Sequence, residues 1–223
     1  VGIGLMHSVA WMPRLLPLFH EHYPDVSVRL IEQGDELLLK ALQSNDADII
    51  IGGMPVSTQD VTVTLALEQL LLIVPRAFNI IPSWAYTGNS YENPYEIDPK
   101  QLQGLPLILP STVNDIGGIT NQVLEHFDIR PKFVTTVDSM QTAAMLVAQD
   151  MGYLFTSPIF LKAQMAELAP NIVYCMARGI PDSRKIVAVY HSDTYKEEMI
   201  SQFLKLLRVV MFKDQPGMFP LDG

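Results

Sequence analysis

Apolar residues recur at two different spacings along the first quarter of the chain, and these spacings predict alternating strands and helices. Residues 1–4 form a short apolar run that is typical of a buried strand. Over residues 8–22, apolar side chains recur at the spacing of one helix face: Met12, Leu15, Leu16 and Phe19. Pro13 suits the first turn of this helix, whereas Pro17 predicts a bend or a delayed start.

The following segments continue the alternation. Residues 26–31 are β-rich and alternate between apolar and polar positions, so they predict a strand. Asp35 is placed to cap a second helix, with Leu38 and Leu42 facing inward. Residues 48–52 contain an apolar run that ends in glycine, as in a strand buried on both faces. The order β-α-β-α-β predicts a mostly parallel sheet with helices on its faces.

A second α/β block follows after a break. Residues 70–74 predict a strand, and the polar, aromatic, proline-rich stretch 79–99 predicts a long surface excursion. The remaining predicted elements are strands at 105–109, 132–137, 152–155, 171–176 and 186–190, helices at 116–127, 140–147, 158–168 and 199–210, and a turn at 179–182. Because the last helix is left over from the second block, the simplest closure returns the chain to the first, which gives two lobes with two crossings.

Composition excludes several classes of function for this chain. Hydrophobic residues make up 48% and charged residues 17% of the 223 residues, which is typical of a globular domain. The net charge is −9 and the basic residues are scattered, so this part of a protein is a poor nucleic-acid binder. The single cysteine, Cys175, excludes a disulfide within the chain and a Cys-based zinc site, and we expect it to be a small buried residue in a strand.

No membrane segment or targeting segment is visible in the sequence. No run of about 18 apolar residues occurs, and no basic region followed by a long apolar run opens the chain. The chain begins in a strand-like segment without an initiator methionine, so we expect that something N-terminal has been removed.

Four segments that follow predicted strands are candidates for a ligand site. In open α/β sheets, ligands bind beyond the carboxyl ends of strands, where helix N-termini present backbone N–H groups to carboxylates or other polar oxygens. Two segments come from each block, so they would line one cleft if the blocks faced each other. The candidate residues are Met6, His7, Ser8, Gly53, Met54, Ser111, Thr112, Thr156 and Ser157.

Each candidate also has a purely structural interpretation. Ser8 and Ser111 could be helix caps, and His7 could be a packing histidine. Thr156 and Ser157 could simply end a strand before Pro158. Likewise, Gly53 could belong to a plain turn, and Met54 could lie in the core. The prediction therefore depends on the joint placement of the four segments.

Catalysis has little support in the sequence. No nucleophile elbow, phosphate-binding loop or His-Glu-x-x-His motif occurs, and His20 and His22 would face apart on a helix. A hydrolase would need a base beside Ser8 or Ser111, and only His7, adjacent to Ser8, qualifies. We expect no enzymatic activity, no cofactor and no metal.

Three stretches resemble the effector-binding domain of LysR-type transcriptional regulators. The first runs from Met12-Pro13 through the 23–26 segment to residues 46–51. The second is residues 70–76, a leucine-rich run followed by Val-Pro-Arg, and the third is residues 105–110 with 137–139 and 152–154. Together they span nearly the whole chain, and their order and spacing carry the resemblance.

The resemblance implies an α/β, two-lobed type-2 periplasmic-binding-protein-like fold with a central cleft and two hinge crossings. Lobe I would be residues 1–72 plus 184–223, and lobe II residues 73–183. It further implies a cytoplasmic location, an antiparallel homodimer or a full-length tetramer, and DNA binding only through an N-terminal winged helix-turn-helix domain absent from this chain. The effector contacts would come from the four candidate segments, with Ser8 at the usual hydroxyl position.

Two departures from the family pattern bear on this assignment. The first candidate loop is about two residues shorter than usual, which puts Ser8 in doubt. The 79–99 excursion is longer than typical and would either cover the mouth of the cleft or add to the dimer surface. The implied function is a ligand-sensing, dimerising regulator domain that binds a small-molecule effector between its lobes; the alternative is a solute-binding receptor of a transport system, which has the same fold.

The charge of the ligand can also be predicted. The four candidate segments contain no lysine or arginine, so an anion would depend on hydroxyls and helix N-termini, with Arg178 near the hinge as a further contact. We therefore predict a small ligand of low charge, with one carboxylate at most.

Overall fold

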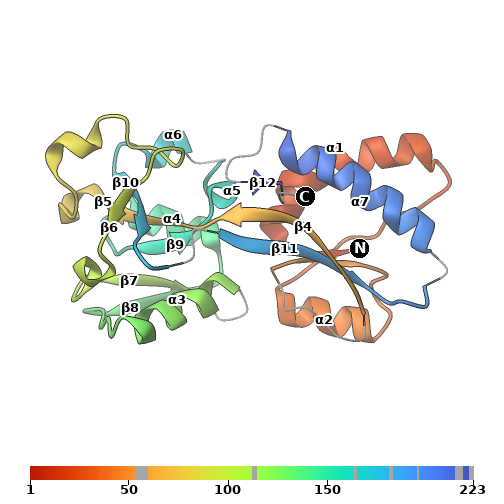
Figure 1. Cartoon of the computed structure of the whole chain (residues 1–223), viewed down its shortest axis with the longest axis horizontal. Coiled ribbons are helices and arrows are strands. Elements are labelled where there is room, and N and C mark those ends of the chain that lie inside the picture. Colours follow the sequence, from red (N-terminus) through yellow and green to blue (C-terminus); the bar gives the residue numbers. More distant parts are fainter. Residues whose placement is uncertain are drawn as a thin grey trace. The chain divides into compact units, whose positions relative to one another are not determined.

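The computed structural model describes residues 1–53, 60–111, 115–162, 165–180, 183–194, 196–213 and 218–220. The chain forms two compact units (Figure 1): unit 1 comprises Val1–Glu68 and Arg184–Gly223, and unit 2 comprises Gln69–Ser183. The chain therefore leaves unit 1 after Glu68 and re-enters it at Arg184.

The sheet of unit 1 has the strand order β12-β4-β11-β3-β1-β2. Its strands are β1 (Gly2–Ile3), β2 (Ile31–Glu32), β3 (Ile50–Gly52), β4 (Val61–Gln69), β11 (Ser183–Tyr190) and β12 (Met218–Phe219). Strand β1 pairs in parallel with both β2 and β3, which confirms the predicted parallel block. The returning strand β11 runs antiparallel to β3. Its Val187 and Val189 pack with Leu38, Leu42 and Ile50 in a buried cluster.

Helices α1 (Leu5–His22), α2 (Asp35–Gln43) and α7 (Glu197–Phe212) belong to unit 1. The last helix belongs to unit 1, in agreement with the predicted return of the chain to the first block, and the structure shows that it packs against α1. The rings of Phe19 and Phe203 meet edge to face with their centres 5.3 Å apart, and Arg14 donates a 3.0 Å hydrogen bond to the carbonyl oxygen of Val210. Figure 1 shows α7 lying beside α1.

Helix α1 differs from its prediction at the N-terminus. It begins at Leu5, directly after β1, rather than at residue 8, and Gly4 occupies the position before its first turn. The delayed start predicted at Pro17 is also wrong, because α1 continues through both Pro13 and Pro17. The two prolines lie four residues apart on the exposed face, where water can hydrogen-bond the carbonyl oxygens that the missing N–H groups leave.

The strands of unit 2 have the order β6-β10-β5-β9, beside the pair β7-β8. They are β5 (Leu71–Pro75), β6 (Tyr95–Ile97), β7 (Leu107–Pro110), β8 (Val134–Val137), β9 (Leu154–Thr156) and β10 (Ile172–Ala177). Strands β7 and β8 are parallel, and a parallel bridge between Leu107 and Tyr153 joins β7 to the β9 segment. The second predicted α/β block is thereby confirmed, although β5 runs antiparallel to both β9 and β10.

The helices of unit 2 are α3 (Asp115–His126), α4 (Met140–Val147), α5 (Pro158–Leu161) and α6 (Met165–Leu168). The last two replace the single helix predicted over 158–168. Among the described helices of the whole chain, none has both the length and the apolar character needed to cross a membrane.

Strands β4, β6 and β12 were not predicted from the sequence, and the strand predicted over 26–31 is shorter in the structure. Strand β4 alternates Val61, Val63 and Leu65 with threonine and alanine, which is the period-two pattern of a half-buried strand. Strand β6 lies inside the 79–99 excursion, where the turn residues obscured it. In contrast, the strand predicted over 26–31 pairs only at Ile31–Glu32, because the preceding residues make no ladder with β1.

The 79–99 excursion covers the edge of β10. Along the chain, the 3-10 helices Arg76–Phe78 and Ser83–Tyr86 precede strand β6, and the 3-10 helix Pro99–Leu102 follows it. Strand β6 pairs in parallel with Cys175–Ala177 of β10. One step earlier, the Asn89 side chain hydrogen-bonds both the N–H and the carbonyl oxygen of Tyr174, at 2.8 and 2.9 Å. The side-chain amide thus takes the place of a neighbouring backbone at this edge.

Candidate ligand-binding site

In unit 1, the two predicted loops lie at one edge of the sheet. Strands β1 and β3 pair in parallel, with Ile3 opposite Ile51, so their carboxyl ends point the same way. The structure places Met6, His7 and Ser8 in the first turns of α1 and Gly53 directly after β3. Met54 lies outside the described residues.

Ser8 is not a helix cap. It lies inside α1, and its backbone N–H donates a 2.9 Å hydrogen bond to the Gly4 carbonyl oxygen, the first turn of the helix. The residue is buried, with an exposed fraction of 2%. The capping alternative for Ser8 is therefore wrong, because the helix starts one turn earlier than the apolar pattern indicated.

His7 packs against an aromatic ring and faces a buried carboxylate. Its ring stacks on Trp11 with the centres 4.6 Å apart, and its Nε2 lies 3.1 Å from Oε1 of Glu68. All three side chains are buried. This environment corresponds to the packing role, and a ligand that bound His7 would compete with Glu68 for the same ring nitrogen.

Glu68 and Arg184 form a buried ion pair beside His7. The second carboxylate oxygen, Oε2, accepts from Arg184 Nε at 2.6 Å and lies 2.5 Å from Arg184 Nη2. Burial by itself would raise the pKa of Glu68, but the charge of Arg184, followed by His7, outweighs it and holds this pKa at about 2. Glu68 is therefore a carboxylate at neutral pH. No local sequence signal could have paired residues 116 positions apart.

In unit 2, the candidate residues again follow neighbouring parallel strands. Ser111 follows β7, and its backbone N–H already donates to the Val137 carbonyl oxygen at 2.8 Å. Thr156 is buried and pairs with Leu71 across β5 and β9. Ser157 caps α5, accepting from the N–H of Ile159 at 3.3 Å. Thr112 lies outside the described residues.

Gly117 allows the first turn of α3 to approach the end of β7. A Cβ at this position would lie 2.5 Å from the Pro110 carbonyl oxygen and 2.9 Å from that of Ser111. These are backbone atoms, which cannot move aside as a flexible side chain can. At Gly118, a Cβ would meet nothing within 4 Å. The glycine at 117 thus positions the helix that carries Ile116 and Ile119.

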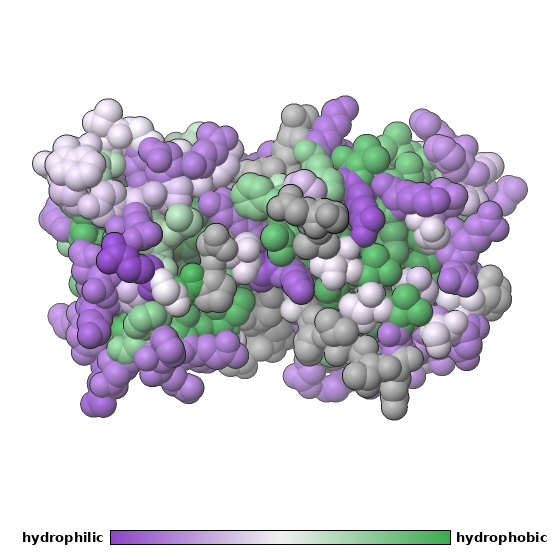
Figure 2. All heavy atoms as spheres, in the orientation of Figure 1, coloured by the Kyte–Doolittle hydropathy of each residue, from purple (hydrophilic) through white to green (hydrophobic). Residues whose placement is uncertain are grey.

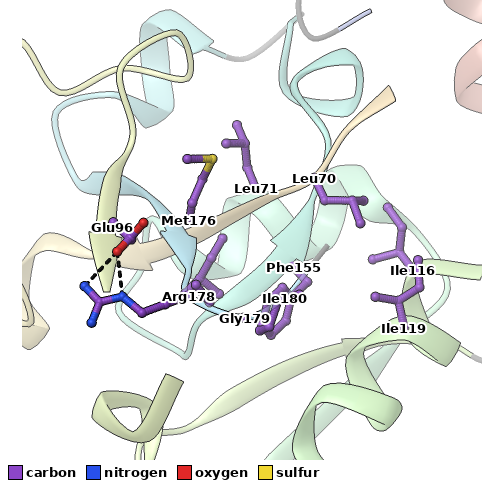
Figure 3. A pocket seen from close by; sticks show the side chains of 12 residues that line it. Leu70, Leu71, Glu96, Ile116, Ile119, Phe155, Met176, Arg178, Gly179 and Ile180 are labelled. Carbon is purple, nitrogen blue, oxygen red and sulfur yellow. Dashed lines mark hydrogen bonds and ion pairs between the residues drawn. The ribbon is translucent and has the colours of Figure 1, made fainter. Parts of the chain in front are cut away.

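A cavity of about 310 Å³ lies in unit 2 (Figure 3). Its walls come from the start of β5, the end of β9, the end of β10 with the following turn, β6 and the start of α3. The lining residues are Leu70, Leu71, Leu72, Glu96, Ile116, Ile119, Phe155, Met176, Ala177, Arg178, Gly179 and Ile180. On the face of unit 2 that Figure 2 shows, hydrophobic residues lie next to hydrophilic ones.

The cavity has an apolar end and a charged end. The side chains of Ile116 and Ile119 lie at one end in Figure 3, the Glu96–Arg178 pair lies at the other, and Phe155 lies between them. Met176 and Arg178 are two residues apart at the end of β10, so they share one face, and Glu96 is the register partner of Met176 on β6. A ligand with an apolar body and one polar group would match this lining.

Sequence reasoning identified the neighbourhood of this cavity but not most of its lining. It singled out Thr156, which directly follows the lining residue Phe155, and it named Arg178, which lines the cavity, as a possible anion contact. Glu96 was missed because it belongs to the excursion, whose strand was not predicted. In the described parts of the chain, no group of three or more His, Cys, Asp or Glu side chains is arranged to hold a metal ion.

Comparison with known proteins gives a consistent family assignment. The family model described as "LysR substrate binding domain" matches residues 1–211. The chain is 26% identical over 211 residues to the "Probable RuBisCO transcriptional regulator" of Porphyra purpurea, covering 91% of this chain and 62% of that protein. The chain thus spans less than two thirds of the length of this relative.

Two solved structures share the fold. The regulatory domain of CcmR from Synechocystis PCC6803, in complex with 2-PG, is 17% identical with a TM-score of 0.76, covering 96% of this chain and 97% of that one. The regulatory domain of MetR, a LysR family regulator from N. meningitidis, is 15% identical with a TM-score of 0.75, covering 99% and 96%. Both support the predicted type-2 periplasmic-binding-protein-like fold. The chain belongs to the LysR substrate binding domain family.

Proposed function

We propose that this chain senses a small molecule that binds in the unit 2 cavity and that this binding controls transcription by a longer regulator. The observation that carries the proposal is the cavity of about 310 Å³ with an apolar end and one charged pair. Small-molecule sites have this size and this combination of apolar walls with few polar groups. The family match across residues 1–211 favours a regulator over the transport-receptor alternative.

Two of the loop residues predicted from the sequence lie next to elements that line the cavity. Ser111 precedes α3, whose Ile116 and Ile119 line the cavity, and Thr156 directly follows the lining residue Phe155. We propose that Thr112 and Ser157 act with them in unit 2; in unit 1, the burial of His7 and Ser8 and the contact of His7 with Glu68 favour a structural role. The units, 1–68 with 184–223 and 69–183, would be the two regulatory subdomains.

Regulation would follow from a difference in effector affinity between two conformations of the domain. A ligand shifts such an equilibrium only as far as it binds one conformation better than the other. DNA binding would belong to a part of the regulator outside this chain, since the net charge of −9 disfavours contact with phosphates. Such a protein would act in the cytoplasm, where it can reach DNA.

We also propose that the domain forms a homodimer, antiparallel as in the family, with a tetramer possible for a full-length regulator. In the described part of the chain, β8 pairs with β7 alone, and Phe133 and Val134 at this edge strand are exposed. An exposed apolar strand edge is a surface that a second chain can cover. Sedimentation equilibrium over a range of concentrations should show a dimer, whereas a monomer at high concentration would contradict the proposal.

Native mass spectrometry of freshly purified protein tests the sensing role, because a retained effector appears as a defined added mass. Ile119→Trp should fill the cavity and abolish this adduct, and any ligand-induced rise in melting temperature should disappear with it. The matched control is Gln122→Trp, at an exposed position of α3, which should retain both. An adduct that survives Ile119→Trp would place the effector elsewhere.

A further inference from the structure

We infer that Arg178 selects the charge of the effector: the cavity takes an apolar molecule with a single carboxylate, which replaces Glu96 on the guanidinium. The inference rests on the proposed function of this cavity and adds the chemical class of its ligand. It depends on three features of the described residues, namely the geometry of the Arg178–Glu96 pair, its exposure, and the apolar walls beside it.

The Arg178–Glu96 pair leaves part of the guanidinium unused. Both Nε and Nη2 of Arg178 lie 2.7 Å from the same oxygen, Oε1 of Glu96. Within the described residues, no partner is found for Nη1 of Arg178 or for Oε2 of Glu96. A carboxylate that approached from the cavity could engage Nη1 and Nη2 with one oxygen each, the two-pronged arrangement that arginine forms with carboxylates.

The existing ion pair is easy to exchange. The side chains of Arg178 and Glu96 are 71% and 53% exposed, so water solvates both charges and the pair contributes little. A ligand carboxylate held in place by the apolar walls gains more from Arg178 than Glu96 does, because its body is already positioned. Exposure of both side chains also means that neither charge is left buried and uncompensated after the exchange.

Glu96 cannot leave the neighbourhood once it is displaced. Strand β6 is fixed to β10 by its ladder, which the hydrogen bond from the Arg178 N–H to the Ile97 carbonyl oxygen extends at 2.9 Å. The free Glu96 carboxylate therefore stays close to the bound anion. A second negative charge on the ligand would meet this carboxylate and repel it. The pair thus admits one carboxylate and disfavours two.

The other end of the cavity provides the affinity for an apolar body. Phe155 and Ile116 are almost fully buried, and Ile119 joins them from the next turn of α3. Figure 3 shows Ile116 and Ile119 at the end of the cavity opposite Arg178 and Glu96, with Phe155 between the two ends. Ligand atoms that lie there leave water for an apolar surface, which is favourable in proportion to the area covered. A small, fully hydrophilic acid would lack this contribution.

Three matched probes with one apolar body test the inference by calorimetric titration: phenylacetamide, phenylacetate and phenylmalonate, with charges of zero, −1 and −2. Phenylacetate should bind about two- to fivefold more tightly than phenylacetamide, the ratio expected for an ion pair with an exposed arginine. Phenylmalonate should bind more weakly than phenylacetate. Arg178→Gln should abolish the preference for phenylacetate over phenylacetamide. Glu96→Gln should increase the affinity for phenylmalonate more than that for the other two probes.

The control variant is Asp128→Asn, which removes another exposed ion pair of unit 2, that of Arg130 with Asp128 at 3.3 Å, and should change none of the three affinities. Equal binding of the amide and the acid, or an unchanged preference in Arg178→Gln, would overturn the role of Arg178.

The cavity itself is tested separately with Ile119→Trp. If this variant loses all three probes while Arg178→Gln changes no preference, the cavity remains the ligand site and only the charge selection fails. If Ile119→Trp retains the probes, the proposed function of the cavity fails instead. Absence of binding by phenylacetate and by monocarboxylates with longer apolar bodies would overturn both.

Discussion

Arg184 and Glu68, the two residues at which the chain passes between unit 1 and unit 2, form an ion pair with each other. Glu68 is the last residue of the first stretch of unit 1, and Arg184 is the first residue of the returning stretch. The carboxylate oxygen Oε2 lies 2.6 Å from Arg184 Nε, and the two side chains are 0% and 7% exposed. His7 bonds to the other oxygen, so α1 is tied to the same carboxylate.

Removal of the Glu68 charge should destabilise the protein strongly. Glu68→Gln removes the carboxylate charge that the buried Arg184 guanidinium faces, and the loss of one partner of a buried ion pair typically lowers the free energy of unfolding by about 3–5 kcal/mol. Urea denaturation followed by circular dichroism measures this. Glu36→Gln, which removes the exposed Lys40–Glu36 pair of α2, should leave the stability nearly unchanged and serves as the control.

The same carboxylate should make stability depend on acid pH. The folded-state pKa of Glu68, about 2, lies below its ordinary value of 4.5, so its contribution is present above about pH 4.5 and is lost as the pH falls toward 2. Between these values, the unfolding free energy of the wild type should fall more steeply than that of Glu68→Gln. Parallel pH profiles for the two proteins would contradict the buried pair.

His191 should contribute stability at the opposite end of the pH range. Its Nε2 faces the Leu42 carbonyl oxygen at 2.9 Å and its Nδ1 faces Asp60 at 2.8 Å, and these two acceptors raise its pKa above 6.5. A raised pKa gives a contribution that is complete below about pH 6.5 and is lost as the pH rises through the folded-state value. Thermal unfolding across this range should show a smaller pH dependence in His191→Gln, whereas His20→Gln, at an exposed position, should follow the wild type.

Gly117 and Gly118 offer a matched test of the approach between α3 and β7. Gly117→Ala should cost about 1–3 kcal/mol of unfolding free energy, because its Cβ meets the Pro110 and Ser111 carbonyl oxygens. It should also weaken ligand binding, since α3 carries Ile116 and Ile119. Gly118→Ala should instead stabilise by about 0.5–1 kcal/mol, as alanine does inside a helix. Equal effects of the two substitutions would show that the close approach is not required.

Asn89 should protect the edge of β10 from exchange with solvent. Asn89→Ala removes both hydrogen bonds to the Tyr174 backbone and should cost about 1–2 kcal/mol. Hydrogen–deuterium exchange should show faster exchange of the Tyr174 amide. In Asn93→Ala, which removes a hydrogen bond to the Gly88 carbonyl oxygen within the excursion, the Tyr174 amide should exchange as in the wild type.

Cys175 should be chemically silent in the folded protein. Burial raises the pKa of its thiol to about 12, so almost no thiolate forms near neutral pH. A thiol reagent such as DTNB at pH 8 should label the protein only after unfolding in guanidinium chloride. Stoichiometric labelling of the native protein within minutes would show that the thiol is accessible.

The sequence by itself determined the elements whose signal is local. The parallel β1-α1-β2-α2-β3 block, the second block from β7 to β9 and the amphipathic helix α7 all follow from apolar spacing within short windows. The spacing of apolar residues did not predict the bounds of elements that depend on a neighbouring strand. The helix start at Leu5 depends on where β1 ends, and the short pairing of β2 depends on how far β1 extends.

Only the tertiary structure decided which distant side chains meet. Glu68 with Arg184, and Glu96 with Arg178, are separated by 116 and 82 positions, and no periodic pattern relates them. The cavity likewise collects residues from β5, β6, α3, β9 and β10. Such contacts depend on the order and register of strands in the sheet, which long-range packing selects. The spacing of apolar residues along the chain carries no record of that choice.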